Sequence, residues 1–330
     1  MAVRRLITVP GYLALWLAWV STSPIWVAAA AVVDLARGRG TVALRSGGLV
    51  LVYLTCEVLG LAASAGIWLA RAVGFVGDER WLDLHFRLQA WWGTTIFHAI
   101  VRLFGLELSV QGEEEVSQGP FLLLPRHVSS GDSLLASALV AGPYGLRLRY
   151  VLKQELLWDP CLDVVGNRLP NAFIERGSPD GARQIARIAE IASGLGPNDG
   201  VLIYPEGSRA TDLKRDQVIE KFKQAGNAPM SEYARALRFV LPPRPGGALA
   251  ALEAAPDADV VFCEHVGFEG ASSLTTVWQG DLLGGVLHVR FRRVPRAQVP
   301  VERADQIDWL LREWRQVDEW VAKHRLERSQ

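Results

Sequence analysis

The chain has few of the groups around which many enzymes and secreted domains are built. It has three cysteines in 330 residues, Cys56, Cys161 and Cys263, and their spacing matches neither a disulfide framework nor a metal site. We therefore expect free thiols, buried or solvated, in a reducing compartment. The formal net charge is zero, so bulk charge argues neither for nor against a nucleic-acid partner.

Several catalytic signatures are also missing. The sequence has no Gly-x-Ser-x-Gly turn for a serine nucleophile and no Gly-x4-Gly-Lys-Ser/Thr loop for nucleotide phosphates. No second histidine, cysteine or carboxylate stands at ligand spacing, so we expect no metal and no cofactor. Chemistry in this chain has to come from another arrangement.

Long hydrophobic segments are present at the N-terminus. Leu6 to Val33 has no charged side chain, with Pro10 and Pro24 as sites for a kink, and Ser46 to Ala70 is interrupted only by Glu57. A span needs about 20 apolar residues, so we predict a membrane-associated helical hairpin over residues 1–75. It either crosses the bilayer or enters one leaflet, because arginines flank both sides of the first run. For Glu57, a helix-packing or interface position is favoured over a membrane site.

Residues 76–104 follow as an amphipathic segment. Apolar residues recur at helical spacing from Asp78 to Phe104, and Trp91 and Trp92 suit a bilayer interface. We predict an interfacial helix, with a core-facing helix as the alternative.

Residues 105–330 alternate strand and helix patterns, which predicts an α/β fold with a mixed sheet flanked by helices. The expected strands are 106–110, 121–124, 149–152, 172–174, 200–204, 259–268 and 286–294. The expected helices are 132–140, 179–193, one capped by Thr211 through Phe222, and 305–325, with Ile307, Leu311, Trp314, Val317 and Val321 on one face of the last.

The most informative motif is His127-x4-Asp132, which follows the apolar run 121–124. An imidazole needs a partner on one nitrogen before the other can take a proton, and Asp132 can supply that partner. The spacing alone leaves two interpretations open, a hydrogen-bonded loop histidine and a general base, and the three later sequence blocks described below favour His127 as the base. The other five histidines stand in helical or strand patterns, and we interpret them as structural: His85, His98, His265, His288 and His324.

Cationic and polar residues that can bind an acceptor stand after later strands. Arg176 and Arg209 are candidate phosphate ligands because the guanidinium fork matches phosphate oxygens, and Lys153 is a third. Glu206, Gly207 and Ser208 precede Arg209. Glu206 is expected either to bind an acceptor hydroxyl or to brace the arginines.

Four blocks in this order resemble the glycerolipid acyltransferases, in particular the lysophosphatidic acid acyltransferase family. They are Pro125 to Asp132, Phe173 to Arg176, Tyr204 to Arg209 and Val240 to Arg244. The resemblance implies that His127 and Asp132 are a catalytic dyad and that Arg176 and Arg209 bind the acceptor phosphate. It departs from the family pattern at Arg126, where many members have Asn.

The resemblance further implies an O-acyltransferase at the membrane, with its catalytic domain on the cytoplasmic face. Its expected reaction moves a fatty acyl group from acyl-CoA or acyl carrier protein to the sn-2 hydroxyl of 1-acyl-glycerol-3-phosphate, giving phosphatidic acid. Membrane lipid and the acyl donor are the expected partners, and nucleic acid is not. Three alternatives stay open: acylation of another lysolipid, a transacylase with a phospholipid donor, and a non-catalytic lipid-binding module.

Overall fold

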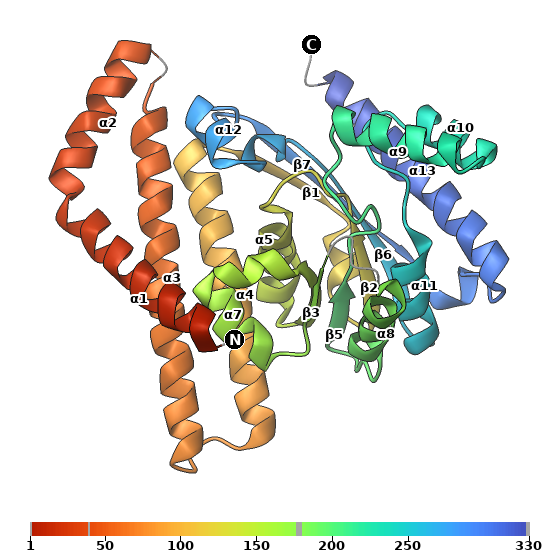
Figure 1. Ribbon diagram of the computed structural model, residues 1–330, viewed down its shortest axis with the longest axis horizontal. Coiled ribbons are helices and arrows are strands. Elements are labelled where there is room, and N and C mark those ends of the chain that lie inside the picture. The colour runs from red at the N-terminus through yellow and green to blue at the C-terminus, as the bar shows by residue number, and fades with distance from the viewer. Residues whose placement is uncertain (1, 39, 176–179, 328–330) are drawn as a thin grey trace. The chain divides into compact units, whose positions relative to one another are not determined.

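The computed structural model describes residues 2–38, 40–175 and 180–327, and its chain divides into two compact units (Figure 1). We call them the helical unit (Met1–Glu107, Ser133–Ser178 and Gly270–Gly285) and the sheet unit (Leu108–Asp132, Pro179–Glu269 and Val286–Gln330). The predicted α/β class, with a mixed sheet, flanking helices and an apolar helical N-terminus, is confirmed.

The helical unit begins with four helices: α1 (Ala2–Ser21), α2 (Ser23–Arg37), α3 (Val42–Ala72) and α4 (Asp78–Phe104). The first apolar run is broken at Thr22, where α1 and α2 meet at 69°. Pro24 lies in the first turn of α2, where a missing N–H costs nothing, whereas Pro10 lies inside α1. By length and composition α3 is long and apolar enough to cross a membrane, and α1 with α2 passes only as one broken span.

One face of α1 packs on α3. Trp16 donates to Thr55 and Trp19 donates to the carbonyl of Gly47, at 3.1 and 3.2 Å. At its start α1 is held by Arg4, which bonds with the fully buried carboxylate of Asp163. These contacts fix which side of α1 faces protein.

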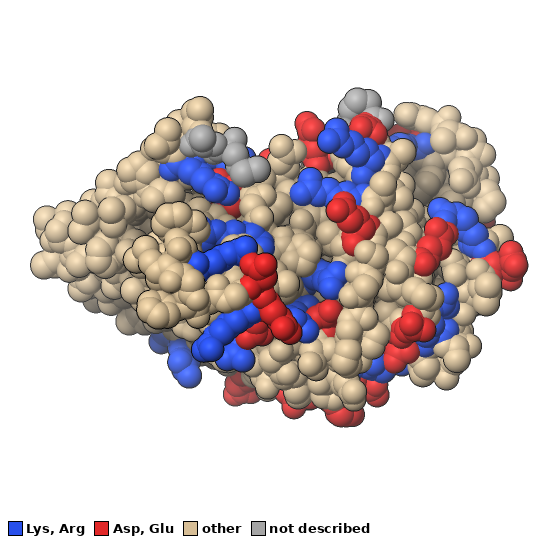
Figure 2. Space-filling view, turned by 90° about the horizontal axis from the view of Figure 1, so that it is seen from below, with Lys and Arg blue, Asp and Glu red and all other residues tan. Residues whose placement is uncertain are grey.

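The opposite side of α1 exposes an apolar stripe, which consists of Val3, Leu6, Leu13, Leu17 and Val20, each 42% exposed or more. Their spacing places them on one helix face. On the face drawn in Figure 2, few charged side chains lie over the end of the helical unit that α1 to α3 form. This stripe is one surface of the unit that an apolar environment would cover.

Glu57 confirms its predicted packing position. Its carboxylate is fully buried and accepts from Trp92 Nε1 of α4 and from the N–H of Cys161 at the start of α7 (Pro160–Val164). The apolar face of α4 packs in a cluster with α7 that includes Phe86 and Leu88. This is the core-facing alternative for α4; the interfacial interpretation stays a prediction for its exposed side, where Trp91 lies.

The predicted helix 132–140 differs from the structure. It is α5 (Asp132–Ala136), followed by a π-helical turn (Ser137–Ala141) and α6 (Gly142–Tyr144). Helix α4 approaches this turn at Gly93, whose added Cβ would stand 2.4 Å from Ser137 Oγ. The close approach therefore requires glycine. The unit also contains β3 (Arg147–Lys153), which pairs parallel with β4 (Ala172–Ile174), and α12 (Leu274–Gln279).

The sheet unit carries five strands in the order β1-β7-β6-β2-β5. Their bounds are β1 (Glu107–Gln111), β2 (Phe121–Pro125), β5 (Asp199–Leu202), β6 (Asp259–Val266) and β7 (Val286–Val294). Strand β2 is parallel to both β5 and β6, and β6 is antiparallel to β7. All five residues of β2 are buried, as expected for an apolar run in the middle of a sheet.

The described part of the sheet unit also contains the α-helices α8 (Gly181–Ala192), α9 (Asp212–Gln224), α10 (Ala228–Ala236), α11 (Pro245–Ala254) and α13 (Arg303–Glu327). Thr211 caps α9 as predicted, by accepting from Lys214 N. The buried face of α13 holds Trp309, Leu310, Trp314, Val317 and Val321, whereas the predicted Ile307 and Leu311 are only half-buried at its edge.

Candidate active site

His127 stands in the loop directly after β2, and Asp132 opens α5. The His127 Nδ1 and Asp132 Oδ2 atoms lie 3.0 Å apart. Because a carboxylate only accepts, Nδ1 is the donor and Nε2 is left as the basic nitrogen. The imidazole is 12% exposed and the carboxylate 1%. The structure thus brings the predicted pair together in the geometry of a base and its orienting group.

Asp132 also organises the loop between the two residues. Its carboxylate accepts from the N–H groups of Val128 and Ser129, at 2.7 and 2.9 Å, and from Ser129 Oγ. Burial alone would raise the pKa of Asp132, but His265, His127 and Ser129 together lower it. The carboxylate therefore stays ionised and keeps the proton of His127 on Nδ1.

Glu206 is 1% exposed and joins the third block to the first (residues 204–209 and 125–132). Its Oε1 accepts from His127 N at 2.8 Å, and its Oε2 accepts from Leu241 N at 2.9 Å. The N–H of Ala210 in turn donates to the carbonyl of His127. Burial raises the pKa of Glu206 to about 8, although both backbone donors lower it. Both carboxyl oxygens thus hold main chain in place.

Gly207 has a φ of +64°, in the left-handed region, and an added Cβ would stand 3.1 Å from Cδ of Arg244. Ser208 is buried, and its Oγ has no hydrogen-bond partner in the described part of the chain. Arg209 is half-buried and donates to Ser130 Oγ of the His127 loop at 3.3 Å. The structure therefore places Arg209 beside the candidate base.

Two predicted residues, Arg176 and Lys153, remain. Arg176 lies outside the described residues. Lys153 ends β3 of the helical unit, where it is half-buried and paired in register with Ile174 of β4. Both assignments stay predictions.

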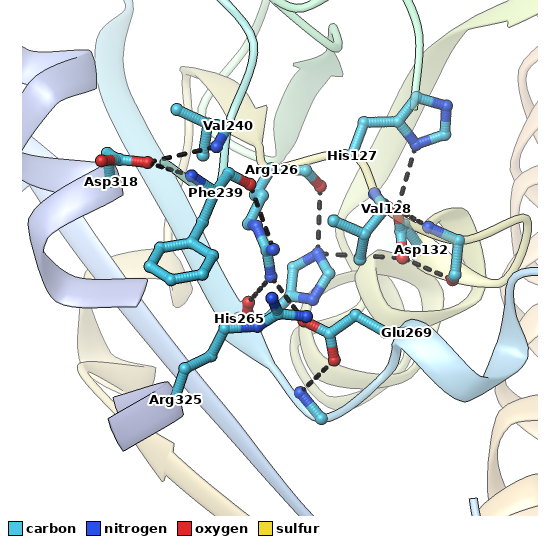
Figure 3. Close-up of polar contacts among 12 residues, drawn as sticks. Arg126, His127, Val128, Asp132, Phe239, Val240, His265, Glu269, Asp318 and Arg325 are labelled. Carbon is cyan, nitrogen blue, oxygen red and sulfur yellow. Dashed lines mark hydrogen bonds and ion pairs between the residues drawn. The ribbon is translucent and has the colours of Figure 1, made fainter. Parts of the chain in front are cut away.

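Sequence reasoning missed several residues that contact the His127 loop. The ring of Tyr204 packs on the imidazole at 4.2 Å between centroids. The sequence marks Arg126 only as a departure from the family pattern and His265 only as a structural histidine, whereas Figure 3 shows both beside the dyad. An arginine at the end of a fully apolar strand is the one signal that pointed to a buried partner.

Known proteins share sequence and fold with this chain. A family described as Acyltransferase matches residues 107–263. The mouse (Mus musculus) protein 1-acyl-sn-glycerol-3-phosphate acyltransferase epsilon is 22% identical over 233 residues, which cover 62% of this chain and 58% of the relative. The crystal structure of the 1-acyl-sn-glycerophosphate (LPA) acyltransferase PlsC from Thermotoga maritima has a TM-score of 0.51 at 16% identity, covering 84% of this chain and 97% of that one. The resemblance read from the four blocks is confirmed.

Proposed function

We propose, from the premise that residues 107–263 of this chain form an acyltransferase domain, that the protein makes phosphatidic acid. It would transfer a fatty acyl group from acyl-CoA or acyl carrier protein to the sn-2 hydroxyl of 1-acyl-glycerol-3-phosphate. The observation that carries the proposal is the pair of His127 and the buried Asp132, with 3.0 Å between Nδ1 and Oδ2. The chain spans 58% of the curated relative it matches, so this activity is proposed for the chain and not transferred to it.

His127 acts as the general base. Its Nε2 takes the proton of the acceptor hydroxyl as the hydroxyl oxygen bonds to the thioester carbonyl carbon. The carbon–sulfur bond then breaks, and the imidazolium returns the proton to the leaving thiolate. Asp132 stabilises the imidazolium between these steps because it is ionised and bonded to Nδ1.

Arg209 is proposed to bind the acceptor phosphate, because its guanidinium reaches Ser130 on the same loop as the base. Arg176 and Lys153 are proposed as further phosphate ligands on their sequence positions alone. The N–H of Gly207 donates to the carbonyl of Tyr204 at 3.0 Å, so Gly207 is proposed to shape the turn that presents Arg209. The hydroxyl of Ser208, which has no hydrogen-bond partner among the described residues, suits a polar contact to the same acceptor. Glu206 supports the acceptor indirectly, since its carboxylate holds the main chain of His127.

The membrane location is part of the same proposal. A lysolipid acceptor resides in a bilayer, and the apolar stripe of α1 together with α3 supplies a surface that a bilayer would cover. Both donors are water-soluble thioesters of the cytoplasm, so we place the dyad on the cytoplasmic face.

The test uses purified full-length protein in detergent, labelled oleoyl-CoA or oleoyl carrier protein, and a panel of lysolipids. Wild type is compared with His127→Ala and with His288→Ala, a control histidine that is half-buried on β7. We expect phosphatidic acid from wild type and the control but not from His127→Ala. Product from a different lysolipid would replace the acceptor, and product without thioester would indicate a transacylase. No product under any condition would favour a lipid-binding module.

A further inference from the structure

Arg126, the residue before the candidate base, carries a buried positive charge. Its side chain is 2% exposed. Its guanidinium donates to the carbonyls of His265 and Phe239, at 2.7 and 3.2 Å, and to Glu269 Oε1 at 2.9 Å (Figure 3). A buried cation is tolerated only when it is paired and hydrogen-bonded, so the Arg126 guanidinium needs these three acceptors. If Arg126 is replaced, the acceptors in turn lose their buried hydrogen-bond donor.

His265 returns the contact from β6. Its Nε2 lies 3.0 Å from the carbonyl oxygen of Arg126, and because a carbonyl only accepts, Nε2 carries the proton. The same Nε2 lies 3.8 Å from Asp132 Oδ1. Burial lowers the pKa of His265. It is therefore a neutral donor near neutral pH, and it contacts both the main chain and the carboxylate of the dyad.

The peptide group between Arg126 and His127 is consequently fixed at both ends. Its carbonyl accepts from His265, and its N–H donates to Glu206 Oε1 at 2.8 Å. The orientation of this peptide plane sets the direction in which the Cα–Cβ bond of His127 leaves the chain. Buried side chains therefore determine where the imidazole points.

Glu269 extends the contact to the C-terminal helix. Its Oε2 accepts from Gly267 N at 2.8 Å, and its Oε1 lies 3.3 Å from Nη2 of Arg325 on α13. Burial alone would raise the pKa of Glu269, but Arg126 and then Arg325 lower it to about 2. Its carboxylate is thus ionised between two guanidinium groups.

We propose that Arg126 is a positioning residue for acyl transfer, and that the buried Arg126 and His265 together with the half-buried Glu269 form a brace that orients His127 toward Asp132. The catalytic consequence rests on the proposed function. The brace itself concerns only the main chain at residues 126–132 and can be measured without any substrate.

The test substitutes Arg126→Lys in the full chain. Lysine keeps the charge but has one nitrogen, which cannot reach the three acceptors at once. The matched control is Arg292→Lys, because Arg292 also ties the sheet to α13, through Glu313 at 2.6 Å, without contacting the His127 loop. Hydrogen–deuterium exchange is measured on the peptide that covers residues 126–132. The parameters kcat and KM are measured with the lysolipid acceptor that the acylation assay identifies.

We expect Arg126→Lys to speed exchange in this peptide and to lower kcat by about 10- to 100-fold, the loss typical of a misplaced catalytic group. KM should change by less than about twofold, because no substrate contact is removed. Glu269→Gln, which keeps the shape of the side chain and removes its charge, should change both readouts in the same direction by less. Arg292→Lys should change neither.

A double-mutant cycle separates positioning from general stability. If Arg126 acts through His127, then His127→Ala costs less activity in the Arg126→Lys protein than in wild type. Unchanged exchange in both Arg126→Lys and Glu269→Gln would overturn the brace, and so would faster exchange with an unchanged kcat in active enzyme. If wild type acylates no acceptor, the proposed function fails while the exchange result alone decides whether the brace exists.

Discussion

At the scale of single residues, the Asp132 carboxylate accepts from His127 Nδ1, from the N–H groups of Val128 and Ser129, and from Ser129 Oγ. Asp132→Asn keeps the shape, and its amide oxygen can still accept at the position of Oδ2, but the negative charge that stabilises the imidazolium is lost. We expect kcat to fall by about 10³- to 10⁴-fold, the loss seen when the carboxylate of such a dyad is neutralised. Steady-state kinetics on wild type and variant would measure this. The control is Asp199→Asn, a buried carboxylate that caps a turn at Gly196 away from the dyad; an equal loss there would contradict a specific role for Asp132.

Glu206 predicts a dependence of stability on pH. Its pKa is raised from 4.5 to about 8, so in that window the folded state keeps a proton that the unfolded state has lost. The free energy of unfolding contributed by this group is therefore highest below about 4.5 and falls as pH rises toward 8. Glu206→Gln cannot titrate and should lose this part of the slope.

Urea unfolding of the detergent-solubilised protein between pH 5 and pH 8 measures the slope. The control is Glu253→Gln, an exposed carboxylate paired with Arg303, which should keep the slope of wild type. A slope in Glu206→Gln equal to that of wild type would show that another group is responsible.

The residue scale also shows what sequence can and cannot predict. His127 and Asp132 were identified because they are five positions apart and their contact is local. Glu206 is an unusual residue in its sequence context, but its partners are distant in the sequence: the N–H groups of His127 and Leu241 are 79 and 35 positions away. No local sequence pattern predicts such a pairing. His265 was assigned a structural role because its strand pattern gives no information about the neighbouring strand.

At the scale of elements, α13 bonds with residues 238–240, the segment that contains an acceptor of Arg126. Asp318 of α13 is 3% exposed and accepts from the N–H groups of Arg238, Phe239 and Val240, and the carbonyl of Phe239 accepts from Arg126. Asp318→Asn faces one of these donors with an amide N–H₂. We expect the free energy of unfolding to fall by about 1–3 kcal/mol, the cost of an unsatisfied buried donor.

Because that segment also bonds with Arg126, kcat should fall in Asp318→Asn as well. Thermal unfolding and single-turnover kinetics on the folded fraction measure the two effects. Glu319→Gln, next in sequence and exposed, serves as the control and should leave both unchanged. Destabilisation with an unaltered kcat would mean that α13 supports the fold and not the loop.

Helices with strong periodicity were predicted well, and irregular ones were not. Helix α4 has the predicted bounds because its apolar spacing runs without interruption from Asp78 to Phe104. The π-helical turn at Ser137–Ala141 was missed because an inserted residue shifts the apolar face without any marker residue. Helix α10 was missed because it is nine residues long and begins at Ala228-Pro229, a dipeptide that also suits a turn.

At the scale of the whole molecule, the apolar stripe of α1 makes a prediction about location. Replacing Leu6, Leu13, Leu17 and Val20 by glutamine removes four of the five residues of the stripe and leaves the contacts of Trp16 and Trp19 with α3. We expect a larger share of the protein in the soluble fraction after cell lysis. In vesicle flotation we expect a smaller share of the protein to float with the vesicles. Four glutamines at exposed positions of α9 are the control. Undiminished flotation would place the membrane contact elsewhere, with α3 as the next element to test.

The dependence of the His127 loop on α13 has a consequence for the timing of synthesis. His127 leaves the ribosome about 200 residues before Arg325, which at 5–20 residues per second is about 10–40 s. During this interval the nascent chain contains His127 and Asp132, but it lacks Asp318 and Arg325, which bond with Phe239 and Glu269, two of the residues that contact Arg126. On the roles proposed for these residues, a chain still attached to the ribosome has His127 and Asp132 without their support, and we expect acyl transfer only after α13 has been translated.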